Sequence, residues 1–246
     1  ESGAPHPPAY WKVMVPSFRG FGSPLEPDAQ TCVGESAQPI AAGDAHASKL
    51  PAVQDTSGTI TPVGEGLEVV WLRTVTVSDR ASRGPLAIVR SRPAEIDVYS
   101  LGTYEGSARH SRFEIVRIGA RTAVAARDEA CADSKVDAEC ESVATIFAAA
   151  GGSLPVAGRM TVERTAYGTM KEIGKVKYRL TTDAFVLDAA GLHVKEHLTV
   201  RDANDEEVRK AEGERIFAFA GNDLTTKQPS IWTQLGSPSG PAPAKP

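Results

Sequence analysis

The sequence has no long apolar run and no large excess of charge of either sign. No stretch of its 246 residues approaches the roughly 18 consecutive apolar residues that a membrane helix needs. The formal net charge is −4 and the pI is about 5.8, so the basic excess typical of nucleic-acid-binding proteins is missing. We therefore expect no transmembrane span and no nucleic-acid partner.

Signatures of catalysis and of metal binding are also lacking. The chain contains no G-x-S-x-G elbow, phosphate-binding loop, G-x-G-x-x-G finger or C-x-x-C pair. Residues 193–197 (HVKEH) match H-x-x-E-H, but that zinc motif needs a helix, and on a strand the two imidazoles would lie roughly 13 Å apart. Residues 202–206 (DANDE) resemble the start of a calcium loop, yet Gly at its sixth position and Glu at its twelfth are absent, which favours a polar turn. We expect no metal, no cofactor and no enzymatic activity.

Short runs of β-branched and aromatic residues do recur from about Gly66 onward, separated by turn residues. This pattern is typical of strands. The predicted strands are 67–78, 85–91, 94–101, 112–118, 121–128, 142–149, 157–164, 174–187, 191–201 and 207–219. The fold class expected is all-β, an antiparallel meander forming either a barrel or a sandwich. A weak helical pattern covers residues 144–150.

Composition divides the chain into three parts. Residues 1–65 form an arm rich in Pro, Gly and Ala, either draped over a domain or partly disordered, with one predicted strand at 10–15 (YWKVMV). Residues 66–235 form the β-domain, which ends in a short element at 230–235. Residues 236–246 (GSPSGPAPAKP) form a flexible tail.

Two of the three cysteines flank a short polar loop. Cys131 and Cys140 bracket ADSKVDAE between two predicted strands, and a disulfide there would stabilise the fold by roughly 2.5–3 kcal/mol. Neither a nearby His nor a C-x-x-C pair supports zinc instead. Cys32 has no evident partner; it is free, bonded to another chain, or a competing partner for one of the other two. The predicted disulfide indicates an oxidising compartment.

A cationic patch is predicted on one face of the hairpin formed by residues 174–201. Apolar and polar residues alternate there, so Val176, Tyr178 and Leu180 face inward. The outward residues are Lys175, Lys177, Arg179, His193, Lys195, His197 and Arg201. They form either a surface for an anionic partner or a solvated face whose lysines oppose aggregation. A bulge near residues 181–183 would adjust the register.

Glu196 is predicted to point inward among Leu and Val on this hairpin. A buried carboxylate needs a partner. The residue therefore marks either a polar cavity or an error in the assumed register.

Three features resemble mature surface or periplasmic lipoproteins of Gram-negative bacteria: the start ESGAPHPP, the opening AYWKVMV…TCVG, and the predicted hairpin RTAVAARDEACADSKVDAECESVATIFAA. The resemblance implies export to the periplasm or outer surface, with a lipidated Cys, if any, before Glu1. It implies a binding or accessory role with protein partners of the envelope, and it transfers no site residue. We expect a non-enzymatic binding or assembly component. The partner is a protein of the envelope or, as the alternative, an anionic lipid or glycan. The alternative is a barrel-type carrier of a small apolar ligand or lipid.

Overall fold

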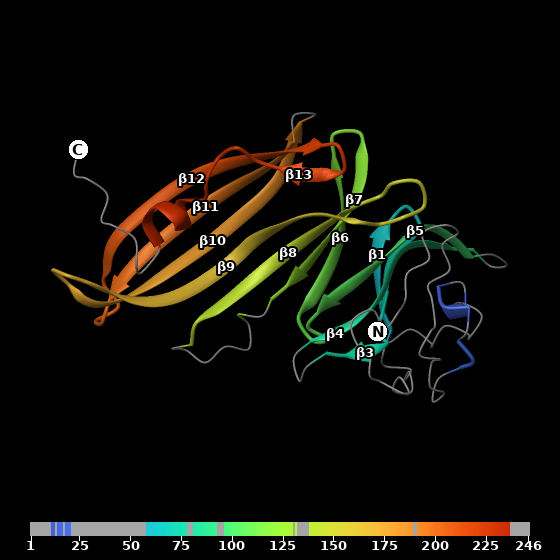
Figure 1. Cartoon of the computed structure of the whole chain (residues 1–246), viewed down its shortest axis with the longest axis horizontal. Coiled ribbons are helices and arrows are strands. Elements are labelled where there is room, and N and C mark those ends of the chain that lie inside the picture. Colours follow the sequence, from blue (N-terminus) through green and yellow to red (C-terminus); the bar gives the residue numbers. More distant parts are fainter. Residues whose placement is uncertain are drawn as a thin grey trace. The chain divides into compact units, whose positions relative to one another are not determined.

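The computed structural model describes residues 11–12, 14–16, 18–20, 58–77, 81–92, 96–129, 131, 138–188 and 191–236, which are mainly strands (Figure 1). The chain divides into two compact units. Unit 1 comprises Glu1–Ile115 and Phe147–Pro155, and unit 2 comprises Val116–Ile146 and Val156–Pro246. Among the described residues, no helix is both long and apolar enough to cross a membrane.

The smaller sheet, in unit 1, has five antiparallel strands. They are β1 (Gly58–Gly64), β2 (Leu67–Leu72), β3 (Val75–Thr76), β4 (Ser82–Ser91) and β5 (Ile96–Gly106). The order is β1-β2-β4-β3, and β5 pairs with β4. An aromatic cluster of Trp71, Tyr104, Phe113 and Phe147 packs in this unit with ring centroids 5.0–6.1 Å apart.

The strand predicted at residues 10–15 is wrong, because the described part of this segment forms a helical turn. The amide of Val15 donates to the carbonyl of Trp11 at 2.9 Å, which is the i→i+4 bond of a helix. Trp11, Met14, Val15 and Phe18 are all buried in the core of unit 1. Their spacing of three, four and seven residues puts them on one face of a helical turn, a signal that the strand propensity of the segment concealed.

The larger sheet has eight strands paired in chain order, so it is an antiparallel meander. The strands are β6 (Ser111–Ile118), β7 (Arg121–Asp128), β8 (Cys140–Ala148), β9 (Val156–Met170), β10 (Gly174–Asp188), β11 (Gly191–Asp202), β12 (Glu207–Ala220) and β13 (Asp223–Thr225). In unit 2, a short π-helical segment, η4 (Trp232–Gly236), lies against the long strands β10 and β11 (Figure 1).

The all-β antiparallel meander expected from the sequence is confirmed. Eleven of the observed strands overlap the predicted ranges, whereas β1 and β13 were not predicted, and residues 144–148 lie in strand β8 rather than in a helix. Over the described residues both sheets are open, with β13 and β6 as the outer strands of the larger one. The described β-structure begins at Gly58, inside the predicted arm. Cys32, the rest of residues 21–57 and residues 237–246 of the predicted tail lie outside the described residues.

The predicted bulge at residues 181–183 is in the wrong place. Strands β10 and β11 pair without interruption from Val176 opposite Asp202 to Val186 opposite Leu192. The register shifts between Val186 and Asp188, next to the turn. Because the pairing is uninterrupted, alternate positions along this stretch lie on opposite faces of the hairpin.

Candidate functional site

The cationic face of the β10–β11 hairpin is the first candidate site. Register places Lys177 opposite Arg201 and Arg179 opposite Thr199, while the intervening Tyr178 is buried. The seven residues predicted for the patch occupy alternate positions of these two strands, in phase with Lys177 and Arg201. Their positions therefore lie on one face of the hairpin.

A hollow of about 420 Å³ lies in the middle of this face. It is lined by Lys177, Arg179, Thr181, His197, Thr199, Arg201 and Asp205. Three permanent cations and one carboxylate give the lining an excess of positive charge, and the two threonine hydroxyls add hydrogen-bonding groups. Such a lining suits a small anionic group.

Carboxylates are interleaved with the cations around the hollow. Arg179 binds Glu163 on β9 at 3.0 Å, and Arg201 binds Asp205 at 3.2 Å. His197 lies 3.6 Å from both Asp183 and Glu212. The patch is thus a mosaic of both signs rather than a uniform basic surface. Sequence alternation along one hairpin could not reveal this fully, because Glu163 and Glu212 come from the neighbouring strands β9 and β12.

Strand β12 brings a further cation to this mosaic. The Lys210 ammonium lies 3.2 Å from the Glu212 carboxylate and, together with the nearby His197, lowers the pKa of that carboxyl below its usual value. His193, at the other end of the patch, lies 3.0 Å from Glu214. All four strands β9–β12 therefore contribute charged side chains to this face.

A second hollow, of about 810 Å³, adjoins the first at Lys177 and Asp205. Tyr167, Lys175 and Asp202 are among the residues that line it. The Lys177 ammonium lies 5.8 Å from the centre of the Tyr167 ring, within the range of a cation–π contact.

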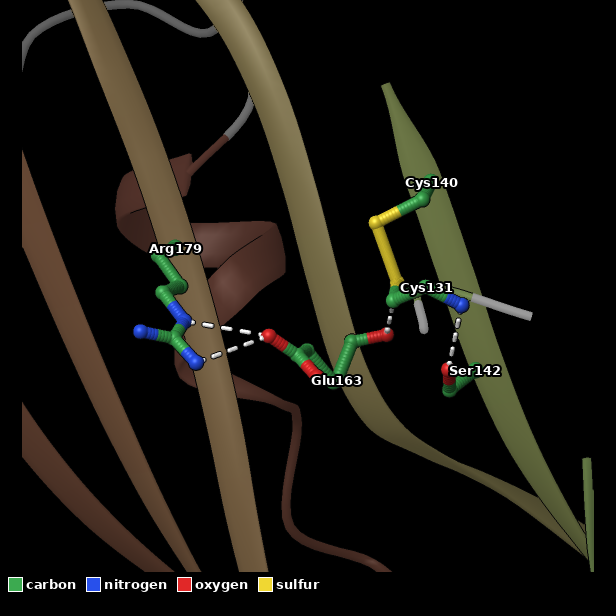
Figure 2. The surroundings of a disulfide bond; sticks show 5 residues. All are labelled: Cys131, Cys140, Ser142, Glu163 and Arg179. Atoms are coloured by element: carbon green, nitrogen blue, oxygen red, sulfur yellow. Dashed lines mark hydrogen bonds and ion pairs between the residues drawn. A yellow bond between two sulfur atoms is a disulfide. The ribbon is translucent and has the colours of Figure 1, made fainter. Parts of the chain in front are cut away.

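The predicted disulfide is present and lies near the cationic face. Cys131 and Cys140 are bonded at the start of β8, and the amide of Cys131 donates to the Ser142 hydroxyl at 3.0 Å. Figure 2 shows Glu163 between the disulfide and the patch: its carbonyl oxygen lies 3.9 Å from the Cys131 sulfur, and its carboxylate binds Arg179. The disulfide thus holds the loop end against the strand that positions Arg179.

Glu196 lies on the opposite, inward face of β11 and is the most buried charged side chain described, with 1% of its surface exposed. Its carboxylate accepts hydrogen bonds from Arg215 at 2.9 Å, from the Ser230 hydroxyl at 3.0 Å and from the Ile231 amide at 2.8 Å. The inward orientation predicted from the sequence is confirmed. The carboxylate marks a docked chain segment, not a polar cavity.

Residues 230–232 complete this second candidate site. Ile231 and Trp232 join a core cluster with Tyr178, Leu180 and Leu198. The Trp232 ring lies 4.7 Å from the Arg164 guanidinium and 6.3 Å, edge-on, from the Tyr178 ring. The sequence indicated a short element at residues 230–235 but not where it packs. The signal was Glu196, because a buried carboxylate needs a hydrogen-bond donor from another part of the chain.

The motifs set aside in the sequence have structural roles in the turns and strands. Residues 193–197 lie within strand β11, so the H-x-x-E-H match lacks its helix. The Asp202 carboxylate accepts from the amides of Asn204 and Glu206, which makes residues 202–206 a self-capped turn. Within the described part of the chain, no three His, Cys, Asp or Glu side chains are grouped so that they could hold a metal ion.

Comparison with protein-family models, with curated proteins and with solved structures finds no match to this chain. The function is therefore argued from the two sites alone.

Proposed function

We propose that this chain is a non-catalytic binding or assembly protein that holds an acidic group of a protein partner on the cationic face of β10–β11. The observation that carries the proposal is the 420 Å³ hollow among Lys177, Arg179 and Arg201. Charged groups on the two sides of an interface steer the partners and fix their register.

The mosaic of charges favours a protein partner over a membrane or a polyanionic glycan. Glu163, Asp183 and Glu212 stand beside the cations that an anionic ligand would approach. A uniformly negative surface would meet these carboxylates and be repelled. A protein surface can place acidic groups at the cations and basic groups at the carboxylates.

We also propose that the protein works outside the reducing cytosol, in the periplasm or on the outer surface of the cell. The Cys131–Cys140 disulfide supports this, because disulfides persist in oxidising compartments and are rare in the cytosol.

The barrel-type carrier of an apolar ligand has less support than a binding role. Both sheets are open over the described residues, and Ile231 and Trp232 fill part of the inward face of the larger sheet.

The test uses two hexapeptide probes and the ¹⁵N-labelled full chain. One peptide alternates Glu and Lys, and the other contains Glu alone. We expect the alternating peptide to shift the amide signals of Lys177, Arg179 and Arg201 saturably and to bind more tightly than hexaglutamate. The double variant K177Q/R201Q should weaken binding about fivefold or more, since each ion pair contributes up to about 1 kcal/mol.

The matched control is K12Q/K227Q, which removes the same charge from two exposed lysines that line neither hollow. It should change the affinity by less than about twofold, because salt screens charges that lie far from the bound peptide. Binding of heparin or of anionic vesicles through the same residues, with no binding of the alternating peptide, would assign the face to a polyanion or a membrane and overturn the proposal.

A further inference from the structure

The inward face of the β9–β12 sheet is shaped around residues 230–232 in three separate ways. Glu196 accepts from the hydroxyl of Ser230 and from the amide of Ile231. Gly213 leaves room for the Ile231 side chain. Trp232 lies between Arg164 and Tyr178. Each of three consecutive side chains therefore meets its own complementary group.

The Ile231 side chain explains why glycine occupies position 213. A Cβ atom at this position would lie 2.5 Å from Cγ2 of Ile231, too close for both to stay in place. Gly213 is not among the glycines with positive φ, so its backbone does not itself demand glycine. Glycine inside a strand weakens it and often marks a close approach by another group. Here the approaching group is Ile231.

Arg215 would still pair with Glu196 when the segment leaves. It binds the Glu196 carboxylate at 2.9 Å from strand β12, independently of residues 230–232. Its Nε also donates to the carbonyl of Gln228, so it contacts the chain that leads into the segment. Removal of the segment would not leave an unpaired buried carboxylate, which is the costly outcome for a charge in a core.

The connection to the rest of the chain is short and separate from the site itself. Strand β13 ends at Thr225, and Gln228 accepts from the amide of Ile216 through its side chain. Residues 230–232 contact Glu196, Gly213, Arg164 and Tyr178. None of these contacts involves residues 226–227. A tether of this kind raises the local concentration of the segment without changing what the site recognises.

From these features we propose that the face around Glu196 and Gly213 is a peptide-binding site for a Ser-Ile-Trp segment, occupied in this structure by residues 230–232 and able to take the same segment from a second copy of the chain. Every copy carries both the site and its ligand. Reciprocal exchange between two copies would therefore be self-complementary and would close as a symmetric dimer. This inference stands independently of the cationic face, which lies on the other side of the hairpin.

The first test measures binding of a labelled synthetic peptide with the sequence of residues 228–236 to the full chain. In W232A the tethered segment has lost its main anchor, so we expect saturable binding by fluorescence anisotropy. Wild type should bind the peptide at least about tenfold more weakly than W232A does, because its own tethered segment competes at high effective concentration. A peptide with Ala in place of the Trp should not bind W232A. Equal binding to both proteins, or none to a W232A that keeps the wild-type circular dichroism, would overturn the proposal.

The second test separates exchange between copies from occupation within one copy. G213L blocks the Ile231 position but keeps the segment, so it serves as donor, and W232A serves as acceptor. We expect each variant alone to be monomeric by native mass spectrometry and the mixture to contain a one-to-one heterodimer. If G213L does not fold, R164A in the W232A background replaces it in the peptide test and should weaken binding. Peptide binding without any heterodimer from two folded variants would restrict the site to its own chain and refute the exchange.

Discussion

At the scale of single residues, Glu196 shows how one polar side chain specifies the place of a distant segment. It occupies an inward position on β11 between Val194 and Leu198, both buried. A carboxylate there is tolerated because three donors reach it from β12 and from residues 230–231. The apolar cluster alone would accept the segment in several orientations, whereas the directed hydrogen bonds favour one.

We expect E196A to lower the free energy of unfolding by about 2–3 kcal/mol, since hydrogen bonds to charged groups contribute about 1.5–3 kcal/mol and Arg215 can partly recover by hydration. Urea unfolding monitored by circular dichroism measures the change. The matched control is E214A, which removes an exposed carboxylate paired with His193 and should cost about 0–1 kcal/mol. Equal losses in the two variants would mean that Glu196 does not hold the segment.

At the scale of elements, the disulfide and the strand register position the cationic face together. Cys140 begins β8, and Cys131 lies against the carbonyl of Glu163 on the neighbouring strand β9. The Glu163 carboxylate in turn binds Arg179 on β10. Glu163 therefore links the disulfide to the patch: its backbone carbonyl contacts Cys131, and its side chain binds Arg179.

The double variant C131S/C140S should be less stable than the oxidised wild type by roughly 2.5–3 kcal/mol, the loop-closure value for a loop of this length. Reductant should produce a similar loss in wild type and none in the variant, as measured by urea unfolding. Alkylation of both cysteines without reductant, detected by intact mass, would show that the bond does not form and would remove the support for an oxidising compartment.

At the scale of the whole molecule, the chain has two units, each with an apolar cluster of its own. Trp11, Met14 and Phe18 pack with β2 and β4 residues in unit 1, whereas Leu198 and Trp232 pack in unit 2. Local stability often follows such cooperative units. Each unit should therefore respond first to damage in its own core.

Hydrogen exchange monitored by mass spectrometry tests this division. F18A should accelerate exchange in β2 and β4 before β10 and β11, and L198A should do the reverse, because truncation of a buried Phe or Leu costs about 2–5 kcal/mol within its own cluster. Uniform acceleration across all four strands in both variants would instead indicate one cooperative core.

The sequence by itself determined eleven of the thirteen strands described, the disulfide and the outward row of the hairpin. These depend on local information: alternation along 175–180 and 192–201, turn residues between runs, and two cysteines close in the chain. Even the inward direction of Glu196 followed from alternation. The prediction failed at residues 10–15, where β-branched and aromatic propensity pointed to a strand, but burial of Trp11, Met14, Val15 and Phe18 requires the spacing of a helical turn.

Only the tertiary structure decided what meets these residues. Two of the carboxylates that convert the basic patch into a mosaic, Glu163 and Glu212, come from β9 and β12. The donors for Glu196 arrive from 19 to 35 positions along the chain. Periodicity gives the direction of a side chain but not its neighbour on another strand. Those neighbours depend on strand register and on which segments lie next to each other in the fold, and both are fixed by packing of the whole sheet.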